Sequence, residues 1–201
     1  QKVSMFDLEV CNGTSVEVLD WISQRIQSGQ RCAVNFVNAH CINVSYRDNA
    51  YYRILRNSTL LLPDGSGIRM AMKWQGIDML ENLNGTDLFP KICQMAALKG
   101  YRIFLLGAEP GIADKVACNM QQRIAGLNIA GTQHGYFDED DVSSVIQSIN
   151  QSGADILLVA KGVPTQEKWI DKHLPQLNTT INMGVGGLFD FYAEKVSRAP
   201  A

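Results

Sequence analysis

Short apolar runs alternate with segments of helical periodicity along most of this chain, and this alternation constrains the fold more than any single motif. Strands are expected at residues 33–37, 59–62, 101–106, 127–131, 156–160 and 180–185. The run 156–160, ILLVA, is apolar at every position, so both of its faces must be covered. Strands of this kind, separated by helices, predict an α/β fold in which one sheet of parallel strands is flanked by helices on both sides.

The expected helices have recognisable start and stop signals. Thr14 and Glu17 have the spacing of a capping box, and Gly29 follows the apolar repeat as a stop. Further helices are expected at 44–56, 66–74, 87–99 and 165–173, and two more where apolar residues repeat around 112–120 and 142–149. No internal repeat or linker divides the chain, so the sequence predicts a single domain over residues 1–201.

The composition is that of a globular protein that needs neither disulfides nor a metal to hold its core. The chain has 201 residues, 46% of them hydrophobic, and a formal net charge of -2. Nucleic-acid binding needs a basic surplus, so no nucleic-acid partner is expected. The histidines lack metal-ligand spacing, and neither a metal nor another cofactor is expected. No segment shows the pattern of a membrane span or of a convincing basic amphipathic helix.

The five cysteines are an odd number without a paired spacing. Cys32, Cys93 and Cys118 lie in apolar stretches, where small buried thiols of a reducing compartment are expected. A metal site or a catalytic thiol is the alternative.

Ligands of parallel α/β sheets bind beyond the carboxyl ends of the strands. The loops in that position are 38–40, 63–67, 107–111, 135–137, 161–167 and 184–190. They hold most of the unusual chemistry of the chain. Turns also attract Gly, Pro and Asp, so each loop is also open to a purely structural interpretation.

Asp64 stands directly after an expected buried strand, between Pro63 and Gly65. A carboxylate at the mouth of a sheet suits a general base when its pKa is tuned toward the working pH. The alternative is an ordinary Pro-Asp-Gly turn in which Asp64 only caps the next helix.

Three further loops combine glycines with polar side chains. Residues 107–111, GAEPG, suit phosphate binding at a helix start, although they lack the third glycine of a dinucleotide fingerprint and the lysine of a P-loop. Gln166 and Glu167 fall in the first turn of an expected helix, where they are able to bond sugar hydroxyls. Residues 184–191, GVGGLFDF, allow a ligand to approach the backbone. Each segment is also consistent with a turn into a packed helix.

Taken in order, these segments resemble one known family. They are Pro63–Asp64–Gly65, Gly85–Thr86–Asp87, Gly107 with Pro110–Gly111, Gly135–Tyr136–Phe137, Pro164 with Gln166–Glu167, Gly184–Val185–Gly186, Phe189–Asp190–Phe191 and Arg198–Ala199–Pro200. The series is similar to that of the WecG/TagA/CpsF glycosyltransferase family, whose members help build teichoic acid, enterobacterial common antigen and capsule or exopolysaccharide. The resemblance covers nearly the whole chain.

The resemblance implies a Rossmann-like, mostly parallel sheet and a metal-independent, inverting glycosyltransferase. Its donor would be a UDP-sugar, such as UDP-N-acetylmannosamine, and its acceptor a polyprenyl-diphosphate-linked sugar. The family's place of action implies a peripheral protein at the cytoplasmic, inner face of the bacterial membrane.

The family's motifs also imply roles for individual residues. Asp64 would deprotonate the acceptor hydroxyl, Asn38 would lie near the reacting sugar, and Gln166 would contact that sugar. The loops 107–111 and 135–137 would hold the nucleotide. The implied substrate-binding residues are Gly65, Thr86, Asp87, Gly107, Gly111, Gly135, Tyr136, Phe137, Pro164, Glu167, Gly186, Asp190 and Arg198.

An inverting transfer needs a base on the acceptor side and charge stabilisation on the leaving diphosphate. Without a metal, helix N-termini and cationic side chains must supply that stabilisation. Lys161, Lys168 and Arg198 are the nearby candidates, and the sequence does not choose among them.

The chain departs from the family pattern at some positions. His40 stands where a Glu is common, Asn82 where an Arg is frequent, and Glu194 where the family has a Gly. These differences bear on donor selectivity and sugar contacts more than on the base.

Two other classes of function stay open. A nicotinamide-dependent oxidoreductase would place a Gly-x-Gly-x-x-Gly fingerprint after the first strand, where this chain has Cys11–Asn12–Gly13–Thr14. A non-catalytic nucleotide-binding domain would keep the same loops without the transfer chemistry.

Family members continue past the Arg-Ala-Pro motif, here Arg198–Ala199–Pro200, with a basic, aromatic-rich appendage. That segment is thought to complete the active site and to touch the membrane. The chain is therefore expected to be one glycosyltransferase domain without the C-terminal appendage, weakly active or inactive. Apolar surface uncovered by the missing segment would favour a homo-oligomer.

Overall fold

Six strands pair side by side in one sheet, and every neighbouring pair is parallel. The computed structural model describes residues 1–195, so Arg198 lies outside the described residues. The sheet order is β4-β3-β8-β7-β5-β6, formed by β3 (Cys32–Val37), β4 (Leu60–Pro63), β5 (Arg102–Gly107), β6 (Asn128–Gln133), β7 (Ile156–Ala160) and β8 (Ile181–Gly184). The prediction of an α/β fold with a parallel sheet is confirmed.

One face of the sheet is covered by α1 (Ser15–Ser28), α5 (Gly85–Lys99), α6 (Ile112–Arg123) and α9 (Leu188–Tyr192). Their apolar residues, such as Ile22, Phe89 and Val116, form one continuous core with Leu105 and Leu158 of the sheet. This cluster is the largest core of the described residues, because the apolar stripes of four helices meet the same sheet face.

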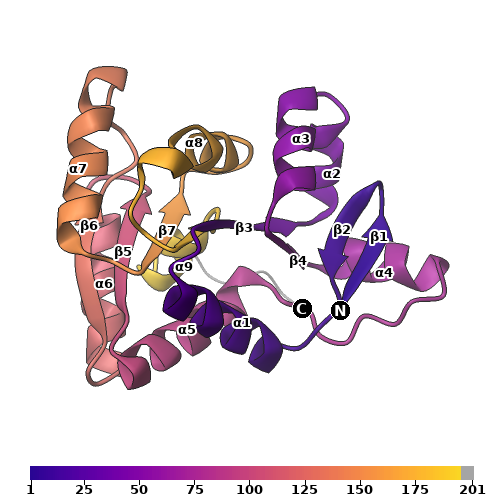
Figure 1. Ribbon diagram of the computed structural model, residues 1–201, viewed down its shortest axis with the longest axis horizontal. Coiled ribbons are helices and arrows are strands. Elements are labelled where there is room, and N and C mark those ends of the chain that lie inside the picture. The colour runs from indigo at the N-terminus through magenta and orange to yellow at the C-terminus, as the bar shows by residue number, and fades with distance from the viewer. Residues whose placement is uncertain (196–201) are drawn as a thin grey trace.

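The opposite face carries two separate cores. The helices α2 (Ala39–Ser45), α3 (Asn49–Asn57) and α4 (Ser66–Trp74) pack with a small antiparallel hairpin, β1 (Lys2–Met5) and β2 (Leu8–Cys11), over the β4 side. The helices α7 (Val142–Ser152) and α8 (Thr165–His173), with short 3-10 turns η1 (Glu139–Asp141) and η2 (Leu174–Gln176), belong to the β5 and β7 side. Figure 1 shows α2, α3 and α8 above the sheet and α1 and α5 below it.

Local signals explain where several helices begin. The predicted capping box is confirmed: the Glu17 N–H donates to Thr14 Oγ1 at 3.3 Å, and the Thr14 N–H donates to Glu17 Oε2 at 2.7 Å. α5 begins at Gly85 rather than at 87, because Asn84 Oδ1 accepts from the Asp87 N–H at 2.9 Å and caps the helix.

Some predictions about elements are wrong. The single helix expected at 44–56 is two helices, because Asp48 caps a new one by accepting from the Tyr51 N–H at 3.0 Å. The first strand, which ends at Cys11, pairs with β1 in a separate hairpin that was not predicted. Cys118 is exposed, because Val116 and Met120 turn the apolar stripe of α6 to the core and leave Cys118 on the outer side. The other four cysteines are buried, and all five are free thiols.

Candidate active site

The chain leaves β8 toward one face of the sheet and leaves its neighbours β3 and β7 toward the other face. β8 continues into α9, whereas β3 continues into α2 and β7 into α8. Diverging connections of this kind open a crevice beyond the carboxyl ends of the strands. Two cavities lie there, and both are lined by Gly186 and Gly187 of the turn between β8 and α9.

We name the two cavities by the strands that border them. The β3/β8 cleft has a volume of about 380 Å³ and is lined by residues that follow β3, β4, β7 and β8 and by the start of α5. The β7/β8 cleft has a volume of about 480 Å³ and is lined by residues that follow β5, β6, β7 and β8. Both volumes fall in the range of small-molecule sites.

Sheet register places Asp64 beside Asn38. Val37 of β3 is paired with Pro63 of β4, so the next residue of each strand emerges at the same level. Asn38 Nδ2 donates to Asp64 Oδ2 at 3.4 Å, while Asn38 Oδ1 accepts from the Cys41 N–H at 3.0 Å. The asparagine amide is thereby held between the start of α2 and the carboxyl group of Asp64.

The environment of Asp64 suits a proton acceptor. Burial raises the pKa of the Asp64 carboxyl above its ordinary value, the Asn38 hydrogen bond opposes that shift, and the charge of Asp87 adds to it. A carboxylate with a raised pKa is a stronger base than a solvated one.

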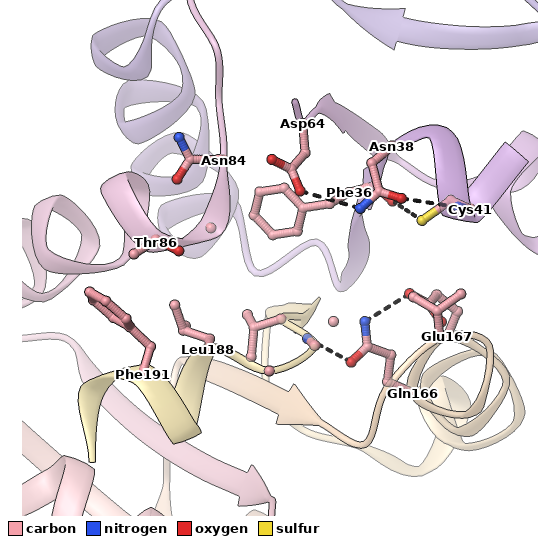
Figure 2. A pocket seen from close by; sticks show the side chains of 16 residues that line it. Phe36, Asn38, Cys41, Asp64, Asn84, Thr86, Gln166, Glu167, Leu188 and Phe191 are labelled. Carbon is pink, nitrogen blue, oxygen red and sulfur yellow. Dashed lines mark hydrogen bonds between the residues drawn. The ribbon is translucent and has the colours of Figure 1, made fainter. Parts of the chain in front are cut away.

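Gln166 and Glu167 form the wall opposite Asp64 and Asn38, as Figure 2 shows. Gln166 Nε2 donates to Glu167 Oε1 at 2.8 Å, and Gln166 Oε1 accepts from the Gly186 N–H at 2.8 Å. A Cβ on Gly184 would lie 2.9 Å from Gln166 Nε2, so the glycine makes room for this amide. Gln166 thus ties the first turn of α8 to the turn after β8.

Glu167 is almost fully buried, with 1% of its surface exposed. Its Oε1 accepts from Gln166, whereas its Oε2 has no hydrogen-bond partner among the described residues. Burial raises the pKa of the Glu167 carboxyl. An unsatisfied buried oxygen in the wall of a cleft has capacity to accept a hydrogen bond from a ligand.

The start of α5 supplies a third wall through Asn84, Gly85 and Thr86. The Thr86 carbonyl accepts from the Tyr192 hydroxyl at 2.6 Å, so this wall is anchored to α9. Asp87 does not line the cleft; Asn84 Nδ2 donates to its carboxylate at 2.7 Å, and it acts on the site through its charge.

Lys161 is the cation of the β7/β8 cleft. Its ammonium donates to the Gly135 carbonyl and lies 3.9 Å from the ring centroid of Phe137. Burial lowers the pKa of Lys161, which the charge of Glu139 opposes. None of the ion pairs formed by residues 1–195 includes Lys161. A partly buried cation without a carboxylate partner suits an anionic ligand.

Glycine 107 has a role in packing. Gly107 has φ +132°, and a Cβ there would lie 2.2 Å from the Ala160 carbonyl oxygen. The Ala108 N–H donates to that same oxygen at 2.8 Å, and the Gly135 N–H donates to the Ala108 carbonyl at 2.8 Å. The glycine therefore lets the loops after β5 and β6 pack close to the end of β7.

The two clefts gather many of the residues singled out from the sequence. The β3/β8 cleft is lined by Asn38, Asp64, Thr86, Gln166, Glu167 and Gly186. The β7/β8 cleft is lined by Gly135, Tyr136, Gly186 and Asp190. Neither lining includes Gly65, Asp87, Gly107, Gly111, Phe137 or Pro164. Of the candidate cations, Lys168 instead pairs with Asp48 at 2.6 Å.

Sequence reasoning missed some of the lining. Asn84 and Cys41 of the β3/β8 cleft and Thr165 of the β7/β8 cleft were not singled out. The Asn-Gly-Thr-Asp order at the start of α5 carries a helix-cap signal that points to Asn84. Cys41 carries no signal of its own, because its place depends on how α2 packs.

No cluster of three or more His, Cys, Asp or Glu side chains within residues 1–195 is arranged to hold a metal ion. In the same part of the chain, no helix has the length and apolar character needed to cross a membrane.

Comparison of the sequence with known proteins identifies relatives of this chain. The sequence model of the Glycosyl transferase WecG/TagA/CpsF family matches residues 3–201. An N-acetylglucosaminyldiphosphoundecaprenol N-acetyl-beta-D-mannosaminyltransferase of Bacillus subtilis (strain 168) is 27% identical over 202 residues, covering 100% of this chain and 78% of the relative. A protein of the same name from Staphylococcus aureus (strain NCTC 8325 / PS 47) is 27% identical over 201 residues, covering 99% of this chain and 78% of the relative. This chain belongs to the WecG/TagA/CpsF family of glycosyl transferases.

Proposed function

We propose that this chain transfers a sugar, with inversion, from a UDP-sugar to a hydroxyl of a polyprenyl-diphosphate-linked sugar. The observation that carries the proposal is the half-buried carboxyl of Asp64, whose pKa is raised, in a cleft that adjoins a second cleft holding the unpaired cation Lys161. The names of the relatives support an N-acetylmannosamine-type donor and an undecaprenol-linked acceptor.

The two clefts fit the two halves of an inverting displacement. Asp64 takes the proton of the acceptor hydroxyl while that oxygen forms a bond to the anomeric carbon of the donor. The bond between this carbon and the diphosphate oxygen breaks, and its electron pair leaves with UDP. The turn Gly186–Gly187 borders both clefts, so the reacting carbon belongs beside it, with the base on one side and the leaving group on the other.

Lys161 offsets the charge that develops on the leaving diphosphate. Its ammonium is fixed by the Gly135 carbonyl and the ring of Phe137, so little reorganisation is needed when that charge forms. In the same cleft, Asp190 and Tyr136 offer an acceptor and an aromatic ring for the ribose and the base of the nucleotide.

The amide of Gln166 and the free oxygen of Glu167 face the place of the transferred sugar. The second N–H of Gln166 Nε2 and the unpaired Glu167 Oε2 provide a donor and an acceptor for its hydroxyl or acetamido groups. Asn38 orients the base through its hydrogen bond to Asp64.

The fold does not support the alternative that this chain is a nicotinamide-dependent oxidoreductase. Its fingerprint belongs after a strand of the main sheet, whereas Cys11–Asn12–Gly13–Thr14 begins at the last residue of β2 in the separate hairpin. The order of the six-stranded sheet also differs from that of the doubly wound dinucleotide-binding fold.

The test is the substitution Asp64→Asn, which keeps the size of the side chain but removes its ability to accept a proton. Transfer is expected to fall about 10²- to 10⁴-fold, the usual contribution of a general base. Binding of the UDP-sugar should change little, because the donor diphosphate lies in the other cleft. Transfer is measured by product formation with a lipid-linked N-acetylglucosamine acceptor, and donor binding by calorimetry.

The matched control is Asp20→Asn, which changes an exposed aspartate of α1 outside both clefts. It should leave turnover unchanged. Unimpaired transfer by Asp64→Asn would reject Asp64 as the base. Absence of UDP binding and of transfer by the unsubstituted chain, tested with a panel of UDP-hexosamines, would reject the proposed activity itself.

A further inference from the structure

Helix α4 presents two large apolar side chains to solvent. Trp74 is 81% exposed and Met70 is 53% exposed, whereas Ile68 and Met72 of the same helix are buried in the core. Met70 and Trp74 are four residues apart, so they lie next to each other on the helix surface. Exposed apolar groups that cluster in this way mark a surface that contacts a partner.

Two cations accompany these apolar side chains. Arg69 and Lys73 are exposed and also four residues apart, and neither takes part in an ion pair of the described residues. We call Arg69, Met70, Lys73 and Trp74 the outer face of α4. Its combination of a Trp, a second apolar residue and unpaired positive charge matches the boundary of a bilayer with anionic headgroups.

Helix α4, which carries the outer face, directly follows Asp64 in the chain. α4 begins at Ser66, two residues after Asp64, and a Cβ on Gly67 would lie 3.2 Å from Cβ of Ala39, the first residue of α2. The start of the helix is thus fixed beside the β3/β8 cleft. α4 has nine residues and is about 13 Å long, and Figure 1 shows it beside the β1–β2 hairpin, at the end of the molecule away from α6 and α7.

We propose that the outer face of α4 docks on an anionic membrane surface and brings a lipid-linked acceptor to the side of the cleft where Asp64 lies. A polyprenyl chain stays in the bilayer while its diphosphate and sugar project into the headgroup layer. A membrane contact on the helix that follows Asp64 shortens the path from that sugar to the base. The link to the acceptor rests on the proposed function, whereas the membrane contact rests on the outer face alone.

The direct test is sedimentation of the chain with vesicles of phosphatidylglycerol mixed with phosphatidylcholine, against vesicles of phosphatidylcholine alone. The chain is expected to bind the anionic vesicles, and added salt should weaken the binding. Trp74→Ser should lower the partition coefficient about tenfold, because the buried indole area is lost. Arg69→Gln and Lys73→Gln should each lower it about fivefold on anionic vesicles only.

Matched controls lie on helices of the other sheet face. Leu98→Ser removes an 88% exposed apolar residue of α5, and Lys115→Gln removes an exposed cation of α6. Both should leave vesicle binding unchanged. Equal losses in the control and α4 variants, or no vesicle binding by the unsubstituted chain, would overturn the proposal. Concentration-dependent self-association that Trp74→Ser abolishes, in the absence of vesicle binding, would assign the face to a second copy of this chain instead.

A transfer assay separates this inference from the proposed function. Trp74→Ser should reduce transfer to an acceptor embedded in vesicles and leave transfer to a water-soluble short-chain acceptor unchanged. Equal losses with both acceptors would overturn the docking role and point to a structural defect. Failure of the unsubstituted chain with both acceptors, together with absence of UDP binding, would reject the proposed function, while the vesicle sedimentation would still decide the membrane contact.

Discussion

At the scale of single residues, two side-chain amides organise the candidate site. Asn38 joins the start of α2 to the carboxyl group of Asp64, and Gln166 joins the first turn of α8 to the Gly186 N–H. Each amide uses both its oxygen and its nitrogen in these contacts, so its orientation is determined. The positions of the groups around the reacting carbon are therefore set before substrate arrives.

Asn38→Asp is expected to shift the pH dependence of transfer. The aspartate keeps an oxygen to accept from the Cys41 N–H, but it replaces a donor to Asp64 with a second negative charge. Both changes favour the protonated form of Asp64, so its pKa rises further above the ordinary value. The acid limb of kcat/KM should move to higher pH by about one unit or more, and activity should recover as pH rises.

The measurement is the pH profile of kcat/KM for Asn38→Asp against the unsubstituted chain. Asn178→Asp, a change of an exposed asparagine before β8, serves as the control and should leave the profile unchanged. An acid limb that stays in place, or moves to lower pH, contradicts the assigned contact between Asn38 and Asp64.

At the scale of elements, close packing at the ends of the strands builds the β7/β8 cleft. The loops after β5 and β6 approach the end of β7 at Gly107 and Gly135, and the residue after β7 is Lys161. The cation is held by contacts with Gly135 and Phe137 of the loop after β6. The cleft therefore depends on backbone approach as much as on the side chains that line it.

Gly107→Ala should destabilise the fold by about 3 kcal/mol or more, since its Cβ would meet the Ala160 carbonyl at 2.2 Å and the backbone must shift. Gly126→Ala is the matched control: Gly126 also has positive φ, at +79°, but nothing lies within 4 Å of its added Cβ. It should cost only about 1 kcal/mol of backbone strain. Urea unfolding followed by circular dichroism measures both, and equal costs would contradict the packing role of Gly107.

The sequence pattern predicted the six strands of the main sheet and most of its helices, because the period of apolar residues reflects which side chains are buried. It failed at 44–56, where a buried stripe continues across the cap at Asp48. It also did not predict the β1–β2 hairpin, whose apolar residues belong to a separate core. It also did not find the outer face of α4, since Ile68, Met70 and Met72 look equally apolar.

At the scale of the whole molecule, the candidate site spans separately packed parts of the fold. The β3/β8 cleft is bordered by α2 from one small core and by α8 from the other, with the large core on the far face of the sheet. A ligand that fills both clefts contacts loops after β3, β4, β5, β6, β7 and β8. Such a ligand is expected to stabilise the folded molecule.

UDP should raise the midpoint of thermal unfolding by about 5–10 °C at a concentration about a hundredfold above its Kd. Lys161→Met, which keeps the side-chain stem but removes the charge, should weaken UDP binding about 10- to 100-fold and so remove about half of that rise at the lower limit and most of it at the upper limit. The measurement is thermal unfolding with increasing UDP, combined with calorimetry.

Uridine provides the matched ligand, because it lacks the diphosphate and its binding should not depend on Lys161. Lys115→Met, a change of an exposed cation on α6, should leave UDP binding as it was. An equal loss of uridine and UDP affinity in Lys161→Met would show that Lys161 supports the fold of the cleft and does not meet the diphosphate.

The sequence by itself determined the parallel α/β fold and the set of polar residues at the strand ends, because both follow from local patterns of burial and turn chemistry. Only the tertiary structure decided which of these polar residues lie next to one another. The pairing of Val37 with Pro63 places Asn38 beside Asp64, and Lys161 lies in a cleft while Lys168 pairs with Asp48. The reason is that strand order and loop path depend on contacts between residues far apart in the chain, which local periodicity does not record.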